Sequence, residues 1–264
     1  MGKRKSAARL RRELKLPVSL PTVLKILREE GLYKGKRKVV EKKRDLREVK
    51  KRLKAFEKLQ VDVKYLDDIP ELYAEYVHHH LPKYQFTARC VRTGAVFMAY
   101  AREKSVTNAT LFLLHLHRHF QEYGISLSGS VIQTDNGTEF TAPWNSRKVT
   151  AFTQVVEKCM GATHHLIPPG AKTYQSDVES FHRLVEEDLY AAEPFGSEKE
   201  FLRKAALYQA SFNCTRKNSY KGDTPLNLAR ETYPGLPAEA LVCIPVILDN
   251  LLVQYKDELV QWAA

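Results

Sequence analysis

Three carboxylates occupy settings that suit metal-dependent chemistry. Asp62 lies in the middle of an apolar, β-branched run at 59–66, where an unpaired charge is costly to bury. Asp135 ends a short apolar run, and the Asn-Gly pair after it predicts a sharp turn that presents the aspartate at a strand end. Glu179 lies in a segment at 175–191 with helical patterning. Two strand aspartates and a helical glutamate can hold two Mg²⁺ ions, hard cations that favour oxygen ligands.

The chemistry expected from such a site is cleavage or transfer at a phosphodiester. Two ions about 3.5–4 Å apart activate the attacking oxygen and stabilise the leaving one, so no protein nucleophile is needed. The nearby Ser176 and Ser180 lack the base and the orienting acid of a hydrolase triad, which argues against a serine hydrolase.

Nearby carboxylates compete for the third ligand position. Asp177 lies about 160° from Glu179 around a helix, so the two cannot face the same metal. Glu186 shares the face of Glu179 two turns further on, and we interpret it as an exposed partner of another residue. Glu139, in the turn after Asp135, could reach the site or cap the next element, and we favour the structural role.

Histidine and cysteine offer only a weak alternative metal site. His115 and His119 have the i, i+4 spacing that can bind zinc, but no acidic or thiol partner lies nearby in the sequence. The consecutive residues His78 to His80 point in different directions on any regular element. The 4 cysteines are far apart and are interpreted as reduced thiols of a cytosolic protein.

Hydrophobic patterning predicts the elements that must position these carboxylates. Strands are predicted at 59–66, 84–92, 95–101 and 129–134, with another near 164–167, and helices at 105–123, 146–160, 175–191 and 198–216. The order β-β-β-α-β-α-β-α-α predicts an α/β domain with a mixed sheet flanked by helices. Residues 67–83 interrupt this order as an insertion between the first two strands.

The net charge of +11 is distributed unevenly along the 264 residues. Residues 1–60 contain 22 Lys and Arg against 7 Asp and Glu, a net charge of +15, whereas the rest of the chain is net −4. A basic head on a mildly acidic body indicates that one end binds a polyanion, most often nucleic acid, although a solvated basic tail would give the same count. No apolar run approaches the ~20 residues of a membrane span and no secretory signal is apparent, so we expect a soluble, cytoplasmic protein.

The head shows a pattern of two short helices around a tight turn. Ser6 can cap the first helix, and Ser19 can cap a second that ends at Gly31. The pair resembles the last two helices of a helix-turn-helix unit, with Lys25 and Arg28 on the open face of the second as DNA-contact candidates. Any basic pair of helices would show this pattern, and the usual third helix is missing. We therefore expect a head that is incomplete, leans on another part of the protein or folds on DNA.

Residues 34–58 are predicted to be a basic amphipathic linker. They contain 13 Lys and Arg among 25 residues, yet apolar residues recur at helical steps at Leu46, Val49, Leu53 and Phe56. One stripe can pack on the next domain while the other faces carry charge toward DNA.

Several motifs occur together in a recognisable order. They are Asp62 in its strand, Gln133 to Phe140, Pro168-Pro169-Gly170, Glu179 to Arg183, Phe212-Asn213, Arg216 and Gly222 to Pro225. In this order they resemble the integrase core of bacterial insertion-sequence transposases, the DDE relatives of retroviral integrases. The resemblance covers roughly residues 57–230.

The resemblance implies a ribonuclease-H-like core in which Asp62, Asp135 and Glu179 bind two Mg²⁺ or Mn²⁺ ions. It implies nicking at mobile-element ends, followed by attack of the freed 3′-hydroxyl on target DNA, with double-stranded DNA as partner and a homo-oligomer assembled on it. Lys172, His182 and Arg183 surround the proposed site and are candidates for phosphate contacts. We expect the protein to be cytoplasmic and associated with the nucleoid when bound to DNA.

The resemblance is imperfect at two points. Leu59 stands where many members have Trp, which affects packing rather than chemistry. The 43 residues between Asp135 and Glu179 exceed the 35 or so common in the family, and we place the extra length at 141–149. Residues 1–77 contain neither His nor Cys, which excludes a zinc-binding head like that of retroviral integrases.

The resulting prediction has four parts and two functional alternatives. The parts are a helix-turn-helix-like segment at 1–33, a basic linker at 34–58, a catalytic core at 59–230 and a C-terminal tail at 231–264 that packs or mediates self-association. The alternatives are a ribonuclease-H-like nuclease that cuts without joining and a non-catalytic DNA-binding relic.

Overall fold

The computed structural model describes residues 14–15, 17–32, 47–142, 146, 148–168 and 172–263. It divides the chain into two compact units, 1–49 and 50–264, which are described separately. Among the residues it describes, no helix is both long enough and apolar enough to cross a bilayer.

The first unit contains the second of the two helices predicted for the head. This helix, α2, runs Leu20–Glu29, and the Ser19 hydroxyl accepts a hydrogen bond from the Thr22 N–H at 3.4 Å as its N-cap. Gly31, with φ of +65°, follows the helix end as predicted. The first predicted helix, from Ser6, lies outside the described residues except at its end, so the helix-turn-helix interpretation stays a prediction.

The second unit is built on one five-stranded mixed sheet. Its strands are β1 (Lys58–Tyr65), β2 (Tyr84–Cys90), β3 (Val96–Ala101), β4 (Val131–Thr134) and β5 (Thr163–Leu166). Their order is β3-β2-β1-β4-β5, with β2 antiparallel to both β1 and β3, and β4 parallel to both β1 and β5. This order and these directions, with helices on both faces, are those of the ribonuclease-H-like fold. The predicted fold class is confirmed.

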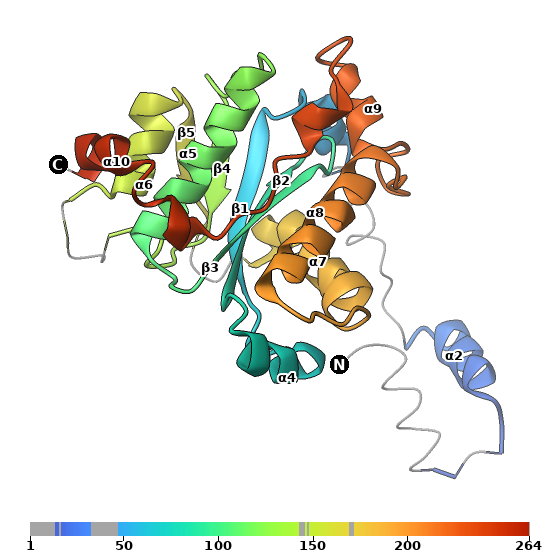
Figure 1. The fold of residues 1–264 in the computed structure, drawn as a ribbon. Coiled ribbons are helices and arrows are strands. Elements are labelled where there is room, and N and C mark those ends of the chain that lie inside the picture. The colour runs from blue at the N-terminus through green and yellow to red at the C-terminus, as the bar shows by residue number, and fades with distance from the viewer. Residues whose placement is uncertain are drawn as a thin grey trace. The chain divides into compact units, whose positions relative to one another are not determined.

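Helices cover both faces of the sheet, as Figure 1 shows. One face carries α5 (Val106–Glu122), α6 (Ala151–Gln154) and its continuation η1 (Val155–Cys159), which share an apolar core with Leu59 and Val61 of β1. The other face carries α7 (Ser176–Val185), its continuation η3 (Glu186–Tyr190) and α8 (Glu198–Cys214). Because side chains alternate along a strand, the polar residues of β1 face α7.

Several predicted boundaries shift by a few residues. The predicted helix at 146–160 begins only at Ala151, because the Thr150 hydroxyl caps it by accepting from the Thr153 N–H. The insertion at 67–83 contains its own helix, α4 (Pro70–His79), which the sequence patterning did not predict. In the linker, residues 34–46 lie outside the described part, and helix is present only at 47–52. Phe56 then adopts φ of +63° and turns its fully buried ring into the core, which ends the predicted helical stripe.

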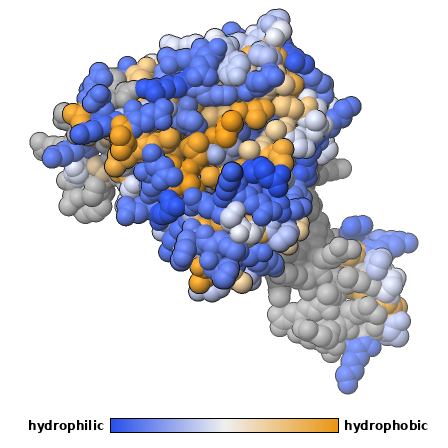
Figure 2. Space-filling view, in the orientation of Figure 1, coloured by the Kyte–Doolittle hydropathy of each residue, from blue (hydrophilic) through white to orange (hydrophobic). Residues whose placement is uncertain are grey.

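The C-terminal residues belong to the second unit. After α9 (Pro225–Arg230) come the short helices η4 (Ala238–Leu241) and η5 (Leu248–Leu251), and then α10 (Lys256–Ala263). Between η4 and η5 the chain lies beside β3, where the Tyr100 N–H donates to the Val246 carbonyl at 2.9 Å. The tail still leaves apolar side chains such as Ile244 and Val253 exposed, and Figure 2 shows apolar residues gathered across this face.

Candidate active site

Asp62 is held at the centre of the sheet. Its strand neighbour across the antiparallel pair is Thr87, and its Oδ1 accepts a hydrogen bond from the Val63 N–H at 2.9 Å. Only 22% of its side-chain surface is exposed. The sequence prediction of a carboxylate embedded in a central strand is therefore confirmed.

Asp135 directly follows β4, the parallel neighbour of β1. Its Oδ1 accepts from the Gly137 N–H at 2.9 Å, while the Asn136 amide donates to the Ile167 carbonyl at 2.8 Å. A Cβ on Gly137 would lie within 2.7 Å of the Glu139 carboxylate, so a larger residue there would displace the Glu139 side chain. The predicted Asn-Gly turn at the strand end is present.

Two glutamines place α7 over these strands: Gln133, which begins one of the motifs noted in the sequence, and Gln60, which the sequence patterns did not reveal. The side-chain amides of Gln60 and Gln133 both donate to the Tyr174 carbonyl, at 2.6 Å and 2.8 Å. Gln60 Oε1 also accepts from the Val178 N–H at 3.1 Å. Each glutamine stands two residues before a candidate aspartate, so the two side chains point to the same face of the sheet. This spacing is the sequence signal that could have identified the glutamines as part of the site. The helix that carries Glu179 is thus tied to both aspartate strands.

The pKa of Asp62 reflects its burial and the neighbouring carboxylates. Burial raises the pKa of Asp62 to about 7, although the hydrogen bond from the Val63 N–H acts in the opposite direction. The negative charges of Asp135, Glu179 and Glu139 add to the rise. Asp135 and Glu179 therefore both lie within electrostatic reach of Asp62.

The donor chemistry of this cluster fits a hard divalent cation. The imidazole nitrogen nearest to Asp62, His182 Nδ1, is 3.7 Å away and belongs to an uncharged ring, as shown below, so it does not neutralise the carboxylate. A divalent cation would supply the missing positive charge and prefers such carboxylate oxygens. Within the described part of the chain, however, no three potential ligands converge closely enough to form a ready-made metal site.

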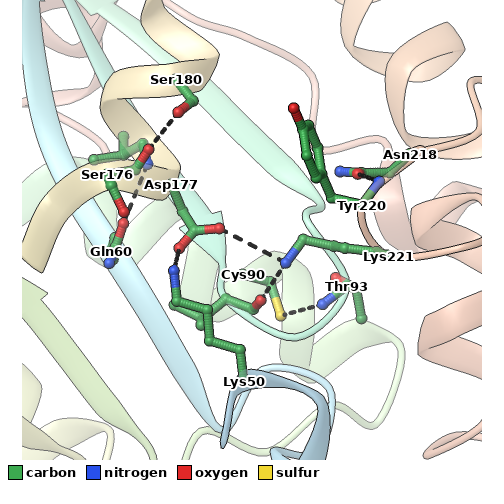
Figure 3. A network of polar contacts seen from close by, with 12 residues as sticks. Lys50, Gln60, Cys90, Thr93, Ser176, Asp177, Ser180, Asn218, Tyr220 and Lys221 are labelled. Carbon is green, nitrogen blue, oxygen red and sulfur yellow. Dashed lines mark hydrogen bonds and ion pairs between the residues drawn. The ribbon is translucent and has the colours of Figure 1, made fainter. Parts of the chain in front are cut away.

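The competing carboxylates have partners of their own. Asp177 pairs with Lys50 and, at 3.7 Å, with Lys221, as Figure 3 shows. Burial alone would raise the pKa of Asp177, but these lysines hold it below its usual value. Glu186 forms an ion pair with Lys64, in agreement with the prediction that it is the partner of another residue and not of the metal.

Glu139 combines the two roles that the sequence left open. Its side chain is buried, and its Oε2 lies 3.2 Å from Lys104 Nζ, which is a structural contact. Its charge also acts on Asp62.

The candidate DNA contacts fall into different environments. Arg183 is 73% exposed and lies 3.8 Å from Glu187, so it is available at the surface, and the Lys172 side chain lies outside the described residues. His182 is mostly buried, and its Nε2 lies 3.0 Å from Thr87 Oγ1. Burial, followed by the charges of Lys64 and Arg89, lowers the pKa of His182 to about 3. A buried, uncharged ring is poorly suited to bind a phosphate, so we assign it another role below.

Lys25 and Arg28 lie on α2 in the first unit. Lys25 is 74% exposed and lies 3.8 Å from Glu29 on the same helix, and Arg28 is in the last turn. Both remain candidates for DNA contact.

The histidine pair considered for zinc has a structural role. His119 Nε2 lies 3.0 Å from the Ala240 carbonyl and His115 Nε2 lies 3.4 Å from the Ile244 carbonyl, so both contact the C-terminal segment. All 4 cysteines are free thiols.

Comparison with known proteins gives similarity in structure only. No protein-family model and no curated protein sequence matches the chain. The catalytic core domain of BIV integrase is 21% identical over 67% of this chain and 95% of its own, with a TM-score of 0.45. A simian T-cell lymphotropic virus intasome in complex with PP2A regulatory subunit B56 gamma contains a chain 17% identical over 68% of this chain and 55% of its own, with a TM-score of 0.48. The ribonuclease-H-like fold described above follows from strand order and direction and does not depend on these matches.

Proposed function

We propose that this chain is an integrase-like DNA transposase that nicks mobile-element ends and joins them to target DNA. The observation that carries the proposal is Asp62, largely buried in the central strand with its negative charge uncompensated and with Asp135 and Glu179 acting on it. A ribonuclease-H-like sheet with acidic residues at these positions supports metal-dependent phosphodiester chemistry. We propose the cytoplasm as the site of action, with the protein on the nucleoid when bound to DNA.

In this proposal Asp62, Asp135 and Glu179 hold two Mg²⁺ or Mn²⁺ ions. When bound, the ions would activate the attacking oxygen and stabilise the leaving one. The chain itself contributes orientation: the Gly137 N–H fixes the Asp135 carboxylate. Gln60 and Gln133 hold the backbone just before α7. They therefore help to set the position of Glu179 relative to the two strands.

The experiment that tests this function is a combined nicking and joining assay. The substrates are a supercoiled plasmid, whose nicking needs no knowledge of the natural recognition sequence, and labelled duplexes taken from the DNA that flanks the gene. We expect cleavage and joined product in Mg²⁺ or Mn²⁺ and neither in chelator. Cleavage without joined product would favour the nuclease alternative, and metal-independent DNA binding without either reaction would favour the relic.

Glu179→Gln should reduce both reactions about 100-fold or more, because it removes one negative ligand from the metal site. Glu187→Gln is the matched control, since Glu187 lies eight residues further on and is 63% exposed. Equal activities of the two variants would remove Glu179 from the proposed ligand set.

We further propose that DNA affinity resides mainly in the basic head at 1–33 and the linker at 34–58, with catalysis in 59–230 and the tail at 231–264 packed on it. Double-stranded DNA is the partner, and a homo-oligomer assembles on it. The net charge of +15 on residues 1–60 supports this division, because the remainder is net −4.

Lys25→Ala and Arg28→Ala should each weaken DNA binding at all sequences and reduce the slope of log affinity against log salt by about 1. The physical reason is that a variant with one phosphate contact fewer releases fewer counterions from the DNA when it binds. Fluorescence anisotropy at several salt concentrations measures the slope. Lys199→Ala, an exposed position on the acidic body, is the control, and a slope equal to that of wild type for all three variants would contradict the assignment of α2 to DNA.

A further inference from the structure

A chain of buried polar side chains leads from the interior of the second unit to Asp62. We call it the Tyr100–His182 chain. Its links are Tyr100 Oη to Tyr190 Oη at 2.9 Å, Tyr190 Oη to Gln85 Oε1, Gln85 Nε2 to Thr87 Oγ1 at 2.6 Å, and Thr87 Oγ1 to His182 Nε2 at 3.0 Å. Beyond the ring, His182 Nδ1 faces Asp62 Oδ2 at 3.7 Å.

One set of hydrogen-bond directions satisfies every group along this chain. Tyr190 has one hydroxyl proton and donates it to Gln85 Oε1, so the Gln85 amide donates to Thr87. Thr87 then has its own proton left to donate, and His182 Nε2 is the acceptor within reach. An uncharged imidazole that accepts at Nε2 carries its proton at Nδ1. That proton points toward Asp62.

The opposite direction is disfavoured by what surrounds its two ends. If Nε2 carried the proton, the lone pair of His182 Nδ1 would face the carboxylate of Asp62. Reversing the rest of the chain, with the Gln85 amide turned over, would also leave the Tyr100 hydroxyl to donate to the thioether of Met98, 3.9 Å away, and thioether sulfur is a weak acceptor.

The same chain connects the elements that carry the proposed ligands. Tyr100 lies on β3, Gln85 and Thr87 on β2, Tyr190 on η3 and His182 on α7. All of these side chains except His182, which is 11% exposed, are essentially fully buried. His182 stands three residues after Glu179, so a fixed ring at His182 sets the rotation of α7 on the sheet.

We infer that His182 is a positioning residue for Asp62, with its Nδ1–H tautomer set by Thr87 and the Tyr100–His182 chain. This inference rests on the proposed function, because it gives the ring a role in orienting a proposed metal ligand. Groups behind a metal ligand orient it and typically contribute 10–100-fold to metal affinity. The sequence motif Glu179 to Arg183 contains His182, but its partner Thr87 is visible only in the fold.

The first test reads the tautomer directly in metal-free, full-length protein. Nitrogen-15 NMR of labelled histidine distinguishes a protonated Nδ1 from a protonated Nε2. We expect His182 as Nδ1–H in the wild type and in Thr87→Ser, which keeps the hydroxyl, and a shift toward Nε2–H in Thr87→Val. A wild-type His182 protonated at Nε2, or a tautomer unchanged by Thr87→Val, would overturn the inference.

The second test measures Mn²⁺ affinity by electron paramagnetic resonance, with circular dichroism to establish that each variant is folded. Thr87→Val should bind Mn²⁺ about 10-fold more weakly than wild type. His182→Asn, whose amide can place a donor near the Nδ1 position, should bind more tightly than His182→Leu. Thr110→Val is the control, because Thr110 is a buried threonine of α5 whose hydroxyl donates to the Val106 carbonyl.

The NMR and Mn²⁺-binding measurements together distinguish a wrong role for His182 from a wrong metal site. If the wild type binds no Mn²⁺, or if Asp62→Asn binds it as well as wild type, the proposed metal site fails, while the tautomer measurement still decides the direction of the chain. If Asp62→Asn abolishes Mn²⁺ binding but Thr87→Val and His182→Leu leave it unchanged, the metal site stands and the positioning role of His182 is wrong.

Discussion

Asp62→Asn should reduce nicking and strand transfer on the order of 10³-fold while leaving DNA affinity unchanged. Asparagine keeps the shape of the side chain but removes the charge that the proposed metal site requires. We expect the variant to lose several kcal/mol of transition-state stabilisation. Because about 1.4 kcal/mol corresponds to a tenfold change in rate, this loss gives the factor above. DNA affinity should persist because the net charge of +15 belongs to residues 1–60.

The measurement combines the nicking and joining assay with fluorescence anisotropy for DNA binding. Asp68→Asn is the matched control, because Asp68 is exposed at the start of the insertion between β1 and β2. Joining at wild-type level by Asp62→Asn would refute the proposed site. Loss of activity together with loss of DNA binding would show instead that the second unit carries the affinity, contrary to the proposed division.

In metal-free protein, Asp62→Asn should gain stability relative to wild type as the pH rises from about 4 to about 7, whatever trend the buried histidines give to both proteins. Folding raises the pKa of Asp62 from 3.8 to about 7, chiefly through burial. Between these values the Asp62 carboxyl holds a proton in the folded protein that it has lost in the unfolded chain, so its contribution to the free energy of unfolding falls as the pH increases. Above pH 7 the buried charge is fully present, and Asp62→Asn should be more stable than wild type by a few kcal/mol.

Urea unfolding at pH 4 to 8 in chelator measures this effect. Asp68→Asn should retain the wild-type trend, because its carboxylate is exposed. Saturating Mg²⁺ should stabilise the wild type at pH 8 but not Asp62→Asn, since a ligand that binds only the folded state raises its stability. Parallel pH curves for wild type and Asp62→Asn in chelator would contradict the burial of an uncompensated charge.

The elements that position the site were largely predictable from local patterns. The alternation around Asp62 predicted a strand, and the Asn-Gly pair after Asp135 predicted the turn at the end of β4. The apolar periodicity at 105–123 predicted α5, whose N-cap is Ser105. These predictions succeed because each depends on residues within one or two turns of the chain.

Features that depend on distant partners were not predictable in the same way. The linker stripe predicted a helix as far as Phe56, but the ring of Phe56 packs against Phe97, Phe120 and Tyr233, and the backbone turns to place it there. The helix in the insertion, α4, buries only Leu72 among its own residues, so its apolar pattern is weak.

By itself, the sequence determined the identity of the candidate carboxylates and the strands or helix that carry them, because an acidic residue in an apolar run and a turn-forming pair are local signals. Only the tertiary structure decided what surrounds them. Strand pairing places Thr87 opposite Asp62, and packing of α7 brings His182 between them. The physical reason is that a hydrogen bond, a tautomer or a raised pKa depends on which side chains meet across the sheet, and residues that meet there can be about a hundred positions apart in the sequence.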